Sequence, residues 1–278
     1  MKQKQWIAFL GMVAVALILA ACDGDSGNNS TEPQGDSSSS AEISSSGEQV
    51  NLSSVVKSSS SSAVVSSSSG ILPSSSSIQY GSFIYGGQTY KTVTIGTQTW
   101  MAENLNYADS AAMPNLKGNS WCYDNSADNC SKYGRLYTWT AAMNIASSYQ
   151  DAEASAVISS THQGACPAGW HIPTDAEWTT LENAVGGEEV AGTVLKSTSG
   201  WNEGGNGTDV YGFSALPAGS RYGYGDFDVV GSLAFFWSAT EYGTDGAYYR
   251  YLGYDYEYML TYCNYKYVAY SVRCLKDF

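Results

Sequence analysis

The sequence predicts an α+β domain over residues 80–278, with two or three helices, a small and mostly antiparallel sheet, and long irregular loops tied by disulfides. Three observations predict this class. Alternating apolar and polar residues around a glycine indicate an early hairpin, two segments have helical periodicity, and the rest is rich in glycine and tyrosine. Nearly all aromatic residues follow residue 79, so only this part of the chain can bury a sizeable core.

The first predicted element is a hairpin over Tyr90–Trp100. Val93 and Ile95 fall on one face and threonines on the other, as the two-residue period of a strand requires. Gly96-Thr97 supplies the tight turn.

Three segments have helix signals. Arg135–Ala146 and the segment after Thr174 each have an apolar stripe, and a shorter helix is predicted over Glu188–Lys196. Thr174-Asp175-Ala176-Glu177 matches a capping box, and Gly186-Gly187 ends that helix. The stripes are Leu136, Trp139 and Met143 in the first segment, and Trp178, Leu181 and Val185 in the second.

Two later segments alternate as strands do. In the first, Tyr248, Arg250 and Leu252 alternate with Tyr249 and Tyr251. In the second, Val268, Tyr270, Val272 and Cys274 fall on one face of a predicted final strand.

The cysteines predict a disulfide framework, because a secreted chain meets an oxidising compartment. Cys122 and Cys130 bracket a short polar loop and are expected to pair. Cys166 and Cys274 would join the segment before the Thr174 helix to the last strand. With Cys22 assigned to a lipid, as the N-terminal pattern described next predicts, Cys263 is left over as a free thiol, and an exchange of Cys263 for Cys274 is the main rival. Zinc is not expected, because paired metal-ligand spacings are missing.

The N-terminus has the pattern of a secretory signal over residues 1–21. Met1–Gln5 carries two lysines and Trp6–Ala21 is apolar, but this run is too short for a stable membrane span. Leu19-Ala20-Ala21-Cys22 resembles the lipobox of bacterial lipoproteins, which implies cleavage before Cys22 and lipid attachment to its sulfur. The alternative is an ordinary secretory signal followed by a chance cysteine.

Residues 22–79 are predicted to be a lipidated N-terminus followed by a disordered serine-rich linker. Runs such as Ser58–Ser62 and Ser74–Ser77 alternate with short apolar breaks, and such a segment cannot bury enough apolar area to offset its ordering entropy. The linker would hold the domain away from the membrane. We expect a protein that is lipid-anchored in the cell envelope, with the outer membrane and the cell surface as its favoured location.

The net charge of -13 lies mostly in the C-terminal domain. An acidic surface repels phosphate backbones, so nucleic acid is not an expected partner.

Two groups of residues are candidates for binding. Asn202, Glu203, Asn206 and Asp209 offer hard oxygen ligands that could bind calcium, although residues of these types more often form turns, and no other cofactor is expected. Arg221, Tyr222, Tyr224, Tyr254 and Tyr256 are candidate ligand-binding residues. Tyrosine rings stack on sugars, and a guanidinium could contact a carboxylated sugar or pair with Asp226 or Asp228.

Seven stretches occur in an order that resembles the FISUMP family (Fibrobacter succinogenes major paralogous domain). They are TVTIGTQTWMAENLNY, YGRLYTW, CPAGWHIPTDAEWTTLE, LKSTSGWN, GFSALPAGSR, FWSATE and YSVRCLKD. The resemblance implies a C-type lectin-like fold, in which a disulfide ties an early helical region to the last strand. The calcium-binding triplets of sugar-binding lectins are missing, and Trp201-Asn202-Glu203 is the nearest approach to one.

The resemblance implies no particular activity, so three functions stay open. The first is non-catalytic display for adhesion or for binding polysaccharide or envelope glycan. The second is a structural or assembly protein that binds another envelope protein. The third is an enzyme related to formylglycine-generating oxidases, with Cys263 or the carboxylates of Glu203, Asp209 and Glu241 as reactive groups.

Overall fold

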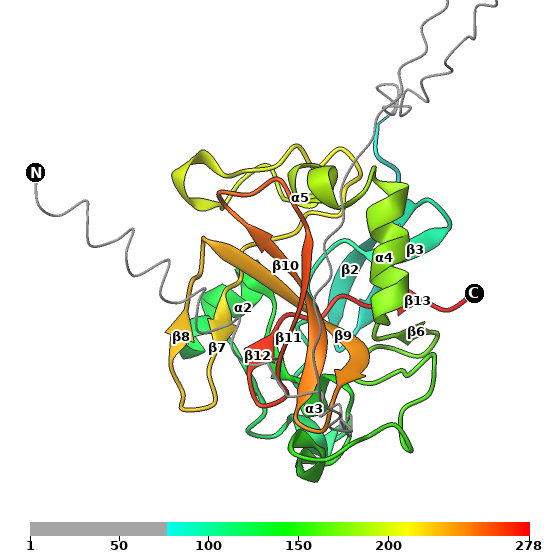
Figure 1. Cartoon of the computed structure of the whole chain (residues 1–278), viewed down its shortest axis with the longest axis vertical. Helices are drawn as coiled ribbons and strands as arrows, with labels where there is room; N and C mark the ends of the chain where they lie inside the picture. The colour runs from blue at the N-terminus through cyan, green and yellow to red at the C-terminus, as the bar shows by residue number, and fades with distance from the viewer. Residues whose placement is uncertain (1–76) are drawn as a thin grey trace, which may run out of the picture. The chain divides into compact units, whose positions relative to one another are not determined.

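The computed structural model describes residues 77–278, which form three antiparallel sheets with a few short helices (Figure 1). The strand orders are β1-β2-β3-β13-β6, β11-β10-β9 and β4-β5-β12-β7-β8. The strands are β1 (Tyr80–Tyr85), β2 (Gln88–Ile95), β3 (Gln98–Met101), β4 (Ser120–Trp121), β5 (Leu136–Thr138), β6 (Trp170–His171), β7 (Ser220–Arg221), β8 (Phe227–Asp228), β9 (Leu233–Tyr242), β10 (Gly246–Gly253), β11 (Leu260–Tyr265), β12 (Ala269–Tyr270) and β13 (Leu275–Lys276).

The helices lie between these strands in the chain. The α-helices are α2 (Ala127–Tyr133), α3 (Trp139–Ala142), α4 (Asp175–Ala184) and α5 (Glu188–Leu195). The short 3-10 helices are η2 (Pro114–Leu116), η3 (Tyr123–Asn125), η4 (Ser147–Gln150) and η5 (Asn202–Gly204). Within residues 77–278 none of these helices has the length and apolar character needed to span a membrane. The predicted signal, Cys22 and the serine-rich linker lie outside the described residues, apart from the last three residues of the linker.

The predicted hairpin and two of the predicted helices are confirmed. Strands β2 and β3 pair antiparallel with Ile95 opposite Gln98, which leaves Gly96-Thr97 as the turn. Helix α4 begins with the complete capping box: the Thr174 hydroxyl accepts from the Glu177 amide, and the Glu177 carboxylate accepts from the Thr174 amide. Its apolar stripe is buried as expected, and α5 follows at the predicted place.

The helix predicted over Arg135–Ala146 is wrong for its first half. Leu136–Thr138 is strand β5, and only Trp139–Ala142 is helical. Neighbouring strands decide this, because β5 hydrogen-bonds to β4 on one side and β12 on the other. The Thr138 hydroxyl then caps α3 by accepting from the Ala141 amide.

The predicted final strand is divided between two sheets. Ala269–Tyr270 pairs with β5 and β7, and Leu275 pairs with β3 and β6. The predicted apolar face is buried, but so are the alternate residues, including Arg273, which is fully buried. This segment therefore runs through the interior and links the two five-stranded sheets.

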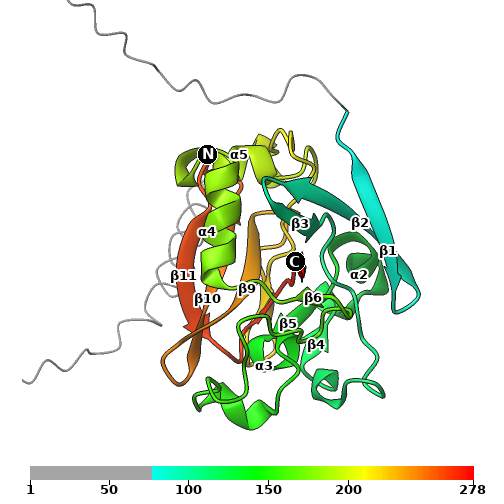
Figure 2. The ribbon, with the colours of Figure 1, turned by 90° about the vertical axis from the view of Figure 1, so that its right-hand side faces the viewer.

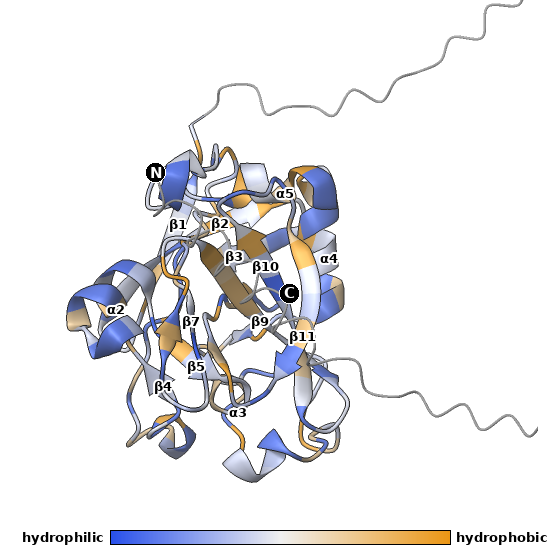
Figure 3. Ribbon diagram, turned by 60° about the vertical axis from the view of Figure 1, so that its left-hand side comes forward, coloured by the Kyte–Doolittle hydropathy of each residue, from blue (hydrophilic) through white to orange (hydrophobic). Residues whose placement is uncertain are grey.

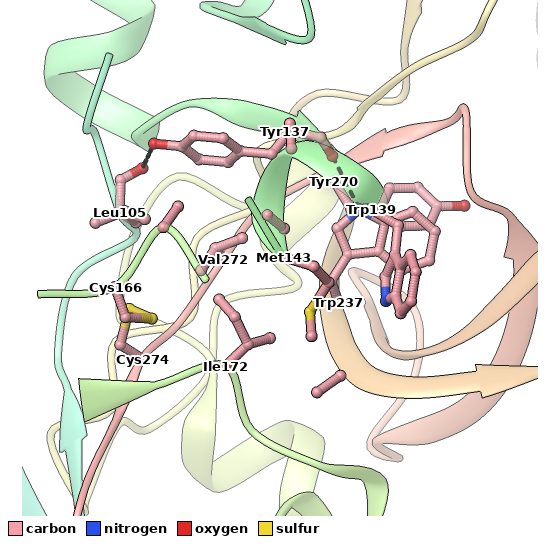
Figure 4. Close-up of a cluster of buried hydrophobic side chains, with 14 of the residues drawn as sticks. Leu105, Tyr137, Trp139, Met143, Cys166, Ile172, Trp237, Tyr270, Val272 and Cys274 are labelled. Atoms are coloured by element: carbon pink, nitrogen blue, oxygen red, sulfur yellow. Dashed lines mark hydrogen bonds between the residues drawn. A yellow bond between two sulfur atoms is a disulfide. The ribbon is translucent and has the colours of Figure 1, made fainter. Parts of the chain in front are cut away.

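The largest aromatic cluster surrounds this central segment (Figure 4). The Trp237 indole donates to the Tyr137 carbonyl at 2.8 Å, and its ring lies 4.6 Å from that of Tyr270. A second cluster is formed where α4 packs against β3 and β9 (Figure 2). Trp178 of α4 lies between Trp100 and Phe236, with ring centroids 4.7 and 5.7 Å away. Burying aromatic rings of this size supplies much of the hydrophobic stabilisation.

The disulfide predictions are confirmed for two pairs. Cys122 bonds to Cys130 and Cys166 bonds to Cys274, with Cα atoms 4.8 and 5.9 Å apart. The free thiol predicted at Cys263 is corrected, because this buried residue of β11 is disulfide-bonded. The prediction set Cys22 aside as the lipidated residue, which left five cysteines and so one without a partner. The number of cysteines alone does not determine which of them form disulfides.

Candidate functional site

An open cavity of about 590 Å³ lies where the Cys122–Cys130 loop faces the β7–β8 hairpin. The loop leads into α2, and Figure 3 shows α2 and β7 on the same side of the molecule. Beneath the cavity, the rings of Tyr123 and Phe227 lie 5.2 Å apart and join the two elements. The lining residues are Asp124, Asn125, Tyr222, Tyr224, Gly225, Asp226, Phe227 and Asp228.

The Cys122–Cys130 loop holds two polar residues against the cavity. Asp124 and Asn125 have φ values of 51° and 54°, a left-handed conformation that Asp and Asn adopt more readily than most residues. The Asn129 side chain fixes the turn by donating to the Tyr123 carbonyl at 3.0 Å. The disulfide closes the loop and so limits its other conformations.

The β7–β8 hairpin supplies the opposite wall. Its turn is closed by the Tyr222 amide, which donates to the Asp226 carbonyl, and by the Gly225 amide, which donates to the Tyr222 carbonyl, both at 2.9 Å. The rings of Tyr222 and Tyr224 are parallel within 2°, with centroids 5.3 Å apart. Tyr224 is 76% exposed, so it presents a flat aromatic surface to solvent.

The wall ends in a strained residue. Val229 directly follows the lining residue Asp228 and has a φ of 58°, which is an outlier for a β-branched residue. The Val229 amide donates to the Asp228 carboxylate at 2.8 Å, which helps to hold this conformation. Backbone strain of this kind gathers at ligand-binding sites, so its position beside the cavity favours a binding role.

The polar groups of the cavity include three carboxylates, which carry its charge, and two tyrosine hydroxyl groups. Asp124, Asp226 and Asp228 all line it. Burial, with Asp228 and Tyr224 nearby, raises the pKa of Tyr222 to about 12, so its hydroxyl stays protonated at neutral pH. The cavity therefore offers carboxylate acceptors, the hydroxyl groups of two tyrosines and aromatic carbon, and its carboxylates repel anions.

Arg221 does not line the cavity. Its guanidinium lies 3.8 Å from the ring centroid of Trp121, and its Nη1 donates to the Tyr222 carbonyl at 3.3 Å. Burial lowers the pKa of Arg221, and the charge of Asp226 partly opposes this. Arg221 is near Asp226, as predicted. Its guanidinium is stacked on the Trp121 ring and lies outside the cavity lining, so this arrangement does not favour a contact with a carboxylated sugar in the cavity.

The structure separates the predicted tyrosines. Tyr222 and Tyr224 line the cavity, whereas Tyr254 and Tyr256 do not. The Tyr254 amide donates to Ser232, and the ring of Tyr256 lies 5.9 Å from that of Tyr251. The ammonium of Lys196 donates to the carbonyls of Gly253 and Tyr256 and so holds the turn that contains Tyr254 and Tyr256.

Three of the four calcium candidates have protein partners. Asn206 accepts from the Trp201 amide, Asp209 accepts from the Ser214 amide and hydroxyl, and Asn202 donates to the Ser232 hydroxyl. Glu203 is exposed on η5 with a φ of 51°. These are the contacts of turns and not of a cation site. Among residues 77–278 no group of three or more His, Cys, Asp or Glu side chains is placed to bind a metal ion.

The groups named for catalysis are also engaged elsewhere. The Glu241 carboxylate accepts from the Lys266 ammonium at 2.6 Å and from the Ala154 amide. Cys263 is disulfide-bonded and so has no thiol to act as a nucleophile.

A buried histidine is a feature that the sequence pattern did not reveal. His171 Nδ1 lies 2.6 Å from an Asp277 oxygen, and Nε2 lies 2.9 Å from a Glu177 oxygen. The ring is fully buried and both nitrogens are occupied, so it joins β6, α4 and the C-terminal segment without a nitrogen left for proton transfer.

Sequence reasoning also missed the acidic wall of the cavity. Asp124 and Asn125 appeared only as part of a polar disulfide loop, and the two hairpin aspartates only as partners of Arg221. Their convergence depends on the pairing of β4, β5, β12, β7 and β8 into one sheet.

Comparison with known proteins gives one match. No curated protein and no solved structure matches the chain. The model of the Fibrobacter succinogenes major domain matches residues 93–276, which is more than half of the chain and includes the cavity, the buried histidine and both disulfides. The protein belongs to the Fibrobacter succinogenes major domain family.

Proposed function

We propose that this protein is a non-catalytic binding protein of the cell envelope, and that its ligand is a glycan held in the cavity between the Cys122–Cys130 loop and the β7–β8 hairpin. The observation that carries the proposal is the parallel pair Tyr222 and Tyr224 above an open cavity lined by three carboxylates.

The chemistry of the cavity suits sugars. The apolar face of a sugar ring stacks on a flat aromatic ring such as Tyr224. The hydroxyl groups around the sugar can donate to Asp124, Asp226 and Asp228, and charge-assisted hydrogen bonds of this kind are the stronger ones. The same carboxylates disfavour an acidic glycan, so the proposed ligand is uncharged.

The anchor and the linker belong to this proposal. Lipid attachment uses the Cys22 sulfur, so the proposal requires that Cys22 takes no part in a disulfide. A lipid there would attach the chain to the envelope, with the outer membrane as the proposed site, and the serine-rich segment would place the domain within reach of polysaccharide.

A C-type lectin-like fold is the finer structural proposal. It is supported by the Cys166–Cys274 bridge between the segment before α4 and the last strands, and by the long looped region between α5 and β9. The proposal involves no calcium, since the candidate ligands are occupied in turns.

Affinity electrophoresis of the full mature chain through gels with neutral and acidic polysaccharides tests the proposal. Retardation by at least one neutral polysaccharide is expected, with none by acidic ones. Tyr224→Ala should weaken retention about threefold to tenfold, the loss expected for one stacking contact. Tyr258→Ala is the matched control, because Tyr258 is also an exposed tyrosine and lies against α5.

Lack of retention in every neutral gel by a folded chain would contradict glycan binding. Crosslinking to a single envelope protein through Tyr224, with no glycan retention, would instead favour the structural role.

A further inference from the structure

A second parallel tyrosine pair lies beside the hairpin. The rings of Tyr265 and Tyr267 are parallel within 10° and have centroids 5.1 Å apart. Tyr267 is 40% exposed and Tyr265 is partly buried. This is the same arrangement as in Tyr222 and Tyr224, with one exposed ring stacked on a more buried one.

The two tyrosine pairs are contiguous. A Cβ atom placed on Gly223 would lie only 2.6 Å from Cδ2 of Tyr267, so the backbone between Tyr222 and Tyr224 rests directly on this ring. Burial raises the pKa of Tyr267, and the neighbours that add to the rise include Tyr265 and Tyr224.

Lys266 holds the second pair in position. Its side chain is fully buried between the two tyrosines in sequence, and its ammonium donates to the Ala152 carbonyl, the Glu241 carboxylate and the Thr244 carbonyl at 2.6 to 2.9 Å. With its three donors satisfied by the loop at Ala152 and by the β9–β10 hairpin, Lys266 fixes the turn that presents Tyr265 and Tyr267 before any ligand arrives.

We propose that Tyr222, Tyr224, Tyr265 and Tyr267 form one continuous platform that binds a linear, uncharged polysaccharide along several consecutive sugar units. This inference rests on the proposed function and goes beyond it. It specifies an internal stretch of a polymer, and not a terminal sugar, as the recognised unit.

The charge distribution supports the choice of an uncharged chain. Three carboxylates line the cavity beside Tyr224, where they can orient one sugar through its hydroxyl groups. Asp245 and Asp151 contribute to the raised pKa of Tyr267, so negative charge lies near the second pair as well. An acidic polymer would meet repulsion along the whole platform.

Calorimetric titration of the full mature chain with a length series tests the inference. The probes are neutral oligosaccharides from disaccharide to hexasaccharide, cut from whichever neutral polysaccharide retards the protein, together with the acidic polymer polygalacturonate. One set of oligosaccharides is prepared from plant cell wall and one from bacterial envelope, which distinguishes the two sources of the same chemistry. Affinity should rise about threefold to tenfold between the shortest and the longest oligosaccharide, and polygalacturonate should not bind.

Four variants test separate parts of the platform. Tyr267→Ala should keep the affinity for the disaccharide and remove the gain with length, whereas Tyr224→Ala should weaken both. Gly223→Ala keeps every ring but forces Tyr267 away from the hairpin, so it should also reduce the gain with length. Tyr267→Phe keeps the ring and should behave as wild type, which separates stacking from a folding defect.

The outcomes distinguish this inference from the proposed function. Equal affinity for all lengths, or a Tyr267→Ala variant with the full length dependence, would overturn the extended platform and leave glycan binding in place. Binding of polygalacturonate would overturn the choice of an uncharged chain. Failure of every oligosaccharide to bind would remove both proposals together.

Discussion

At the scale of single residues, the interior contains several buried charged side chains that are held by hydrogen bonds. His171 and Lys266 each have carboxylate partners, and Arg273 binds oxygens of Asn104, Met101, Phe213 and Ser214. An unpaired buried charge is costly, so each of these side chains stabilises the fold only with its partners in place.

The first residue prediction concerns pH. Burial lowers the pKa of His171, but its hydrogen bonds to Glu177 and Asp277 outweigh burial and leave the pKa raised. The contribution of His171 to stability is therefore complete below its unfolded pKa of about 6.5 and is lost as the pH rises through the folded value. Burial raises the pKa of Glu177, yet its bonds to His171 and Thr174 leave it lowered, so its contribution is lost as the pH falls.

His171→Gln should cost about 2 kcal/mol of unfolding free energy near pH 6, with a smaller cost at high pH, as measured by urea denaturation across a pH series. His162→Gln is the control, since His162 is the other histidine of the chain and contacts only the Met143 carbonyl through its ring. A cost for His171→Gln that does not change with pH would contradict the assigned charge.

The second residue prediction concerns Arg273. Burial lowers its pKa to about 9, so the guanidinium remains charged at neutral pH. Arg273→Met would leave several buried oxygens without a donor and should cost about 3 kcal/mol or more in thermal or urea unfolding. Lys276→Met, three residues later and exposed, should change stability by less than about 0.5 kcal/mol. Equal effects of the two substitutions would show that the buried network contributes nothing.

At the scale of elements, the Cys122–Cys130 and Cys166–Cys274 disulfides have different roles. Cys166–Cys274 spans 108 residues and joins β6 and α4 to the last strands, whereas Cys122–Cys130 spans eight and shapes one wall of the cavity. In the chain-entropy model the longer loop contributes about 4–5 kcal/mol and the shorter about 2–3 kcal/mol.

Removal of each bridge by a double serine substitution should separate stability from binding. Loss of Cys166–Cys274 should lower the midpoint of thermal unfolding more, while loss of Cys122–Cys130 should weaken glycan retention more in the folded protein. Both readouts are taken on the same preparations. The assignment is wrong if loss of Cys122–Cys130 leaves retention unchanged.

Two predicted helices show when local sequence patterns predict secondary structure correctly and when they do not. The Thr174 helix was predictable because capping is a contact between residues three apart. Leu136, Trp139 and Met143 have helical spacing too, but β4 and β12 pair with Leu136–Thr138 and convert half of that helix to strand.

At the scale of the whole domain, residues 268–276 connect its three sheets. This segment adds a strand to each five-stranded sheet and meets the three-stranded sheet through a bridge between Phe236 and Ser271. The tyrosines of the domain differ in burial. Tyr249 and Tyr270 are buried in the core, whereas Tyr224 and Tyr267 stay exposed beside the cavity.

The sequence by itself determined the features that depend on short-range chemistry, which are the β2–β3 hairpin, the capped α4 and the Cys122–Cys130 pair, and it also determined the α+β class and the family. Only the tertiary structure decided which charges are buried, which tyrosines face solvent, and that Asp124 meets Tyr224 across a cavity. The physical reason is that burial and convergence depend on pairing between strands far apart in the chain, and an exposed tyrosine has the same local pattern as a buried one.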